Sequence, residues 1–111
     1  MLDTSPLTAV VERFADRLRA APQSRLQQGA AAAALELARE LALRAQTLEG
    51  APVREVPDAG IFVVGDQVAV AGLDLAEALR AVRAGDSGTA PSEMLDEAVR
   101  LVEQTEVRAM R

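Results

Sequence analysis

The segment at residues 53–79 most constrains the fold predicted from this sequence, because it contains the only convincing strand patterns. Two short apolar runs, 61–64 and 67–70, flank the dipeptide Gly65-Asp66. Glycine at the first position of a two-residue loop is typical of a type II′ β-hairpin. The sequence therefore predicts a hairpin at about residues 60–71.

Both faces of this predicted hairpin are apolar. In the pairing that a two-residue loop imposes, one face carries Ile61, Val63, Val68 and Val70, and the other carries Phe62 and Val64. We expect the first face to be buried. A two-stranded hairpin is marginally stable alone, so the second face or the strand edge calls for a partner. A four-stranded sheet shared by a homodimer would supply one.

Helical spacing of apolar residues predicts four helices, at about 5–21, 24–49, 74–84 and 90–108. Their expected N-caps include Ser5, Ser24 and Asp74, and Gln27 completes a capping box with Ser24. Gly50 is placed to end the second helix.

The predicted fold is a single α+β domain over residues 1–111, mainly helical, in the order helix, helix, hairpin, helix, helix. The second helix is apolar on more than one side, which is typical of a central helix or of a helix shared between subunits. The candidate interface residues are Ile61, Phe62, Val63, Val64, Val68, Val70, Leu35 and Leu43.

Composition argues against most catalytic chemistry, because the chain has no Cys, His, Trp, Tyr or Lys. Carboxylates could still act as acids or bases, and Asp58, Asp66 and Asp74 flank the predicted hairpin. Their simpler interpretations are a turn former, a hairpin loop residue and a helix N-cap. We therefore predict no enzymatic activity, cofactor or metal site, and keep a carboxylate enzyme as the third hypothesis.

The basic residues offer one candidate patch: Arg13, Arg17, Arg19 and Arg25. Acidic residues are interleaved with them, no Tyr or Trp offers a stacking surface, and the net charge of the chain is −5. These features argue against nucleic-acid binding but leave the role of the patch open. The sequence predicts no transmembrane helix and no signal peptide, so we expect a cytoplasmic protein, and the exclusive use of Arg over Lys suggests a GC-rich bacterial source.

The preferred hypothesis is thus a small bacterial interaction or accessory module that forms a homodimer or binds another protein. The alternative is a binder of a small apolar or amphiphilic ligand between the helices and the hairpin, with Arg44 as the anchor for an anionic group. Arg44 could instead form an ion pair with Glu40 or Glu49. A monomer whose helices cover every apolar surface is the remaining structural alternative.

Overall fold

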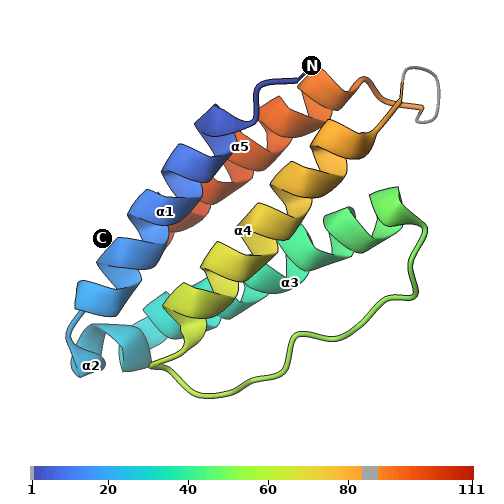
Figure 1. Cartoon of the computed structure of the whole chain (residues 1–111). Helices are drawn as coiled ribbons and strands as arrows, with labels where there is room; N and C mark the ends of the chain where they lie inside the picture. Colours follow the sequence, from blue (N-terminus) through green and yellow to red (C-terminus); the bar gives the residue numbers. More distant parts are fainter. Residues whose placement is uncertain (1, 84–87) are drawn as a thin grey trace.

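The computed structural model describes residues 2–83 and 88–111, and within them the chain forms four long helices and no strand (Figure 1). The long helices are α1 (Ser5–Ala20), α3 (Ala31–Glu49), α4 (Val64–Ala81) and α5 (Pro91–Ala109). A short helix α2 (Gln23–Arg25) and a π-helical turn η1 (Leu26–Ala30) lead from α1 into α3.

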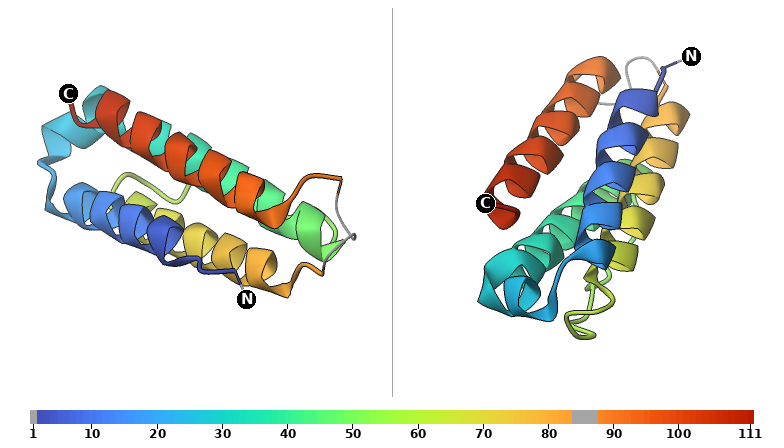
Figure 2. Two further views of the ribbon diagram at one scale, coloured as in Figure 1. Left: turned by 90° about the horizontal axis from the view of Figure 1, so that it is seen from above. Right: turned by 90° about the vertical axis from the view of Figure 1, so that its left-hand side faces the viewer.

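The four long helices form a bundle in which α3 packs most extensively against α4, the next helix in sequence, whereas α1 and α3 are not main neighbours. Helix α1 packs against α4 and α5, and α3 packs against the same two helices. The pairs α1/α3 and α4/α5 therefore occupy the two diagonals (Figure 2). A crossing segment, residues 50–63, returns along the length of the bundle, so that α3 and α4 run parallel (Figure 1).

The predicted hairpin is wrong, and with it the α+β class and the shared four-stranded sheet: residues 64–71 are the first half of α4. Burial in this segment follows a helical period. Val64, Val68, Leu75 and Leu79 are buried at spacings of four, seven and four residues. The hairpin would have placed Val68 and Val70 on one face, yet Val68 is 0% exposed and Val70 is 59% exposed.

Gly65, which suggested a hairpin turn, instead serves helix packing. Gly65 lies inside α4 against α1, where an added Cβ atom would approach Ala15 O to 3.0 Å and Arg19 Cγ to 3.1 Å. Gly72, seven residues later, faces the same helix. Glycine lowers helix propensity by roughly 1 kcal/mol, but the close approach of α1 and α4 requires the missing side chains.

The first and last predicted helices agree with the structure, and the two between them differ from it. Those expected at 5–21 and 90–108 are confirmed as α1 and α5, and the helix expected at 74–84 is only the second half of α4, with residue 84 outside the described residues. Gly50, at φ +67°, ends α3 as expected. The helix expected at 24–49 begins at Gln23 and is interrupted at Gly29, where φ is 137°.

The three expected N-caps are also wrong. Thr4 occupies the cap position of α1, and Ser5 lies inside the helix, where its N–H and hydroxyl donate to Asp3 Oδ1 at 3.0 and 2.6 Å. Ser24 lies within α2, whose cap residue is Pro22 and which has no side-chain cap bond. Asp74 lies exposed in the middle of α4.

The core lies between all four long helices. Its largest fully buried side chains are Phe14, Leu7, Leu41, Leu75, Leu79, Val68 and Val102. Alanines from α3 and α4, including Ala34, Ala38 and Ala76, fill much of the remaining space. Small side chains bring helix axes close together but remove less apolar area from water per residue than leucine does.

Candidate functional site

The strongest electrostatic feature is a buried carboxylate on α5, which the sequence analysis missed. The Glu106 side chain is 5% exposed and lies against α1, where Arg13 Nη2 donates to Oε1 at 2.7 Å and Arg17 Nη1 donates to Oε2 at 3.1 Å. Arg13 Nε also donates to Oε1, at 3.1 Å. Two clues were available: Glu106 follows the core residue Val102 by one helical turn, and Arg13 and Arg17 share one face of α1.

Opposing effects set the protonation of Glu106. Burial raises the pKa of this carboxyl group, whereas the hydrogen bonds and positive charges of Arg13 and Arg17 lower it by more, so that the pKa lies below its ordinary value. The group is therefore ionised at neutral pH. Its bonding is that of a structural ion pair between α1 and α5 and not that of an acid–base catalyst.

The four arginines proposed as a patch are directed to different partners. Arg13 and Arg17 bind Glu106, whereas Arg19 Nη2 donates to Asp66 Oδ1 at 2.8 Å and its Nη1 donates to Asp16 Oδ1 at 3.0 Å. Arg25 Nη1 donates to the main-chain oxygen of Arg111 at 2.6 Å. These guanidinium groups mainly tie α1 and α2 to α4 and α5.

The three candidate acid–base carboxylates are all exposed. Asp58 Oδ1 accepts the N–H of Gly60 at 3.1 Å, which confirms its expected role in a turn. Asp66 binds Arg19, and Asp74 lies further along α4. In the described part of the chain, no group of three or more acidic, His or Cys side chains is arranged to hold a metal ion.

The candidate interface residues separate into three groups. Val64 and Val68 belong to the core, Ile61, Val63 and Leu35 are half-buried, and Phe62, Val70 and Leu43 are exposed. Val64 and Val68 are enclosed by this chain's own helices. A partner binding to the folded bundle would therefore contact mainly the exposed group.

Phe62 is the most exposed large apolar side chain in the described residues, at 72%, although the only other aromatic residue, Phe14, is fully buried. An ordered turn just before α4 holds it in place. The bond from Gly60 N–H to Asp58 starts this turn, Gly60 adopts φ +99°, and the N–H of Val63 donates to Gly60 O at 3.4 Å. The turn directs Ile61 toward the core and leaves Phe62 in solvent.

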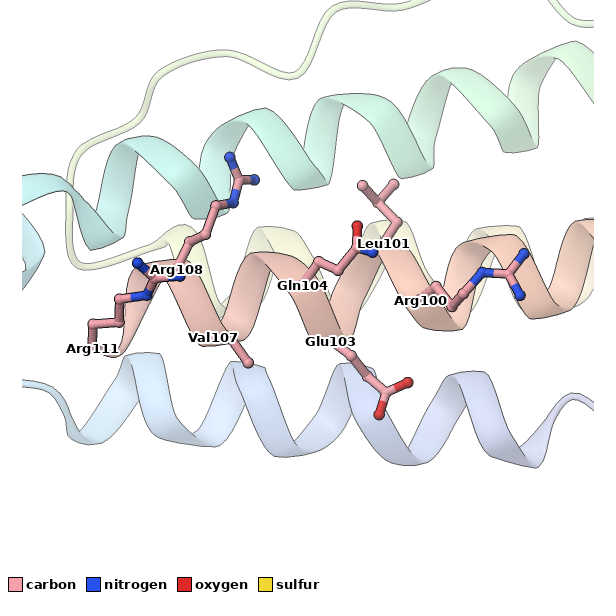
Figure 3. A pocket seen from close by; sticks show the side chains of 7 residues that line it. All are labelled: Arg100, Leu101, Glu103, Gln104, Val107, Arg108 and Arg111. Carbon is pink, nitrogen blue, oxygen red and sulfur yellow. The ribbon is translucent and has the colours of Figure 1, made fainter.

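A shallow trough of about 750 Å³ runs along the outer face of α5 (Figure 3). Six of its lining residues belong to this helix, Arg100, Leu101, Glu103, Gln104, Val107 and Arg108, and Arg111 lies two residues beyond its end. Leu101 and Val107 provide apolar surface, and Val107 is 59% exposed. Three arginines against one glutamate give the trough a positive rim.

Two further hollows border α3. One, of about 800 Å³, lies between α3, α4 and the crossing segment, and its acidic lining residues are Glu49, Glu55, Asp66, Asp74 and Glu77. The other, of about 390 Å³, is formed by α3 and α5 with Leu75 of α4, and includes Arg44. Arg44 Nε donates to Glu40 Oε1 at 3.0 Å, one turn earlier on α3, so an ion pair occupies the proposed anchor.

No protein-family model matches the chain, and neither a curated protein nor a solved structure is significantly similar to it. Among the described helices, none is long and apolar enough to cross a membrane. Functional inference therefore rests on the surfaces described above.

Proposed function

We propose that this chain is a small interaction module that self-associates and has no enzymatic activity of its own. The observation that supports this proposal is the exposure of four large apolar side chains on α4 and the crossing segment: Val53, Phe62, Val70 and Leu73. Exposing apolar area to water is unfavourable, so a partner that covers this area forms a stabilised complex.

The composition of the core supports the same proposal. Alanine fills many core positions in α3 and α4, and each contributes less hydrophobic stabilisation than a leucine or valine would. Burying the outer apolar residues against a second copy would add to this modest core. The exposed positions of Asp58, Asp66 and Asp74 further favour a non-catalytic role, because a carboxylate that acts near neutral pH is commonly desolvated.

Sedimentation equilibrium from about 1 to about 100 µM protein tests this proposal. We expect the apparent mass to rise above the monomer mass of 11.7 kDa, and the melting temperature to rise with concentration, as mass action requires. A single 11.7 kDa species at every concentration would contradict self-association.

Substitution of three exposed residues locates the contact. The variant V53S/F62S/V70S should shift association to higher concentration, because it removes apolar area from α4 and the crossing segment. Leu43→Ser is the control, since Leu43 is also exposed but lines the hollow between α3 and α5. If Leu43→Ser weakened association equally, the contact would not be confined to α4 and the crossing segment.

Binding of an anionic amphiphile is the second candidate function, and the hollow beside Arg44 supports it. Leu43, Leu48, Leu75 and Met94 give this hollow an apolar lining next to the guanidinium group. Decanoate is a suitable probe. It should raise the melting temperature of the wild type but not of Arg44→Ala, while Arg100→Ala on α5 should respond as the wild type does. An equal response of all three proteins would reject the site.

A further inference from the structure

The exposed Phe62 and the trough on α5 present apolar surfaces to solvent and are flanked by charges of opposite sign. Phe62 projects from an ordered turn, and the trough offers the apolar surfaces of Leu101 and Val107. We propose that Phe62 of one copy inserts into the α5 trough of a second copy. This inference rests on the proposed self-association and specifies the two surfaces that meet.

Charge complementarity points to a second copy of this chain as the occupant. Asp58 and Asp66 lie four residues before and after Phe62, and Glu55 lies further along the crossing segment. The trough presents Arg100, Arg108 and Arg111. The acidic residues near the inserted ring would thus meet a basic rim.

Three charges reduce this complementarity without reversing it. Asp66 is already paired with Arg19, Arg54 precedes Glu55 in the crossing segment, and Glu103 lies in the trough, where its charge acts on Arg13 of α1. Glu55 and Asp58 still outnumber Arg54, and the three arginines of the trough outnumber Glu103. The guanidinium groups also favour an aromatic occupant, because a cation over an aromatic face is attracted to it.

The positions of the two surfaces exclude insertion of Phe62 into its own chain's trough. Both lie at the end of the bundle where α1 ends, since Gly65 contacts Ala15 and Glu106 binds Arg17. They belong to diagonal helices, however, and α4 lies behind α5 when the trough faces the viewer (Figure 3). A contact between two different surfaces is heterologous, so each copy can contact one neighbour through Phe62 and another through its trough.

Complementary variants test this arrangement directly. Phe62→Ser removes the inserted ring but keeps the trough, and Val107→Glu blocks the trough but keeps Phe62. Each variant alone should associate on the order of tenfold more weakly than the wild type. An equimolar mixture should form a 1:1 complex and nothing larger, because only one intact ring can meet one intact trough. When R100E/R108E is mixed with Phe62→Ser in place of Val107→Glu, the same 1:1 complex should form, because the copy that donates Phe62 does not need its own basic rim.

The control is Leu43→Ser, because Leu43 is also an exposed apolar side chain but lines the hollow between α3 and α5, outside both proposed surfaces. Circular dichroism would verify that every variant folds. The inference would be overturned, with the proposed function left standing, if Phe62→Ser and Val107→Glu associated as tightly as the wild type. Equal weakening by Leu43→Ser, or a mixture that forms no 1:1 complex, would overturn it in the same way. A monomeric wild type at all concentrations would overturn both.

Discussion

Gly72 of α4 lies directly against Val11 of α1: a Cβ atom at position 72 would come within 2.5 Å of Val11 Cγ1 and 2.7 Å of Cγ2. Real Cβ atoms do not make such contacts. Val11 is buried and β-branched, so it has little freedom to rotate away. This contact fixes how closely α1 and α4 approach, and it explains a glycine in the interior of a helix.

Gly72→Ala should therefore destabilise the protein by about 1–3 kcal/mol, because overpacking outweighs the roughly 1 kcal/mol that alanine gains in helix propensity. Urea unfolding measures the change. In a Val11→Ala background the same substitution should cost less, since the clashing methyl groups are absent. Stabilisation by Gly72→Ala in the wild type would contradict the close packing.

Gly29→Ala should also destabilise the protein, but for a backbone reason. Nothing lies within 4 Å of a Cβ atom at this position, yet φ is +137°, which residues with a side chain rarely adopt. We expect a loss of about 1–2 kcal/mol or more in the free energy of unfolding. Gly88→Ala is the matched control, because it meets equally open space without a positive φ, and should change stability by less than about 0.5 kcal/mol.

Aspartate substitutions at Val68 and Val70 distinguish the helix from a hairpin. Val68→Asp would bury an unpaired carboxylate in the core and cost several kcal/mol, a large part of the roughly 5–15 kcal/mol total stability of a small domain. Val70→Asp should be tolerated, because its side chain faces solvent. Thermal unfolding followed by circular dichroism measures both. Similar losses at the two positions would fit a shared strand face and contradict α4.

Removing the acidic partner of the ion pair between α1 and α5 should cost less stability than removing its two basic partners. Glu106→Gln leaves Arg13 and Arg17 about half exposed and hydrated, so it should cost only about 1 kcal/mol at pH 7. R13M/R17M leaves a buried carboxylate without its partners and should cost about 3 kcal/mol. Urea unfolding of both variants tests this order, and a greater loss for Glu106→Gln would contradict it.

Acidification should remove the contribution of the ionised Glu106 to the free energy of unfolding. Because the folded-state pKa lies below the ordinary value of 4.5, the contribution is fully present above that pH and is lost as the pH falls through the folded-state pKa. The difference in stability between wild type and Glu106→Gln should therefore be constant from about pH 6 to 8 and shrink below about pH 4. A difference that does not change on acidification would contradict the lowered pKa.

Sequence patterns predicted α1, α5 and the end of α3 because these depend on local signals. Apolar spacing defines the first and last helices, α1 and α5, and Gly50 supplies the left-handed residue that ends α3. The start of α4 was not predictable in this way. Gly65-Asp66 is a strong local turn signal, and only its tertiary environment shows why glycine is required there: Gly65 adjoins Ala15, and Asp66 binds Arg19.

The candidate surfaces were predictable only in part for the same reason. Exposure of Phe62 and Val70 agrees with an interface hypothesis, but Val64 and Val68 were assigned to the same surface through the wrong periodicity. The trough on α5 was missed because its residues look like the ordinary polar face of an amphipathic helix. Glu106 was missed because the order of helices around the bundle, which brings α1 beside α5, has no local signature.

The diagonal placement of α1 and α3 has a consequence for how the chain acquires its structure. Both helices find their packing partners in α4 and α5, beyond the crossing segment. A nascent chain that ends before residue 64 therefore has helices whose apolar sides cannot yet be covered, and short isolated helices are marginal in water. Contacts distant in sequence slow folding. Helices α1 and α3 therefore cannot pack before α4 and α5 have been synthesised, so folding is expected only after α5 has left the ribosome.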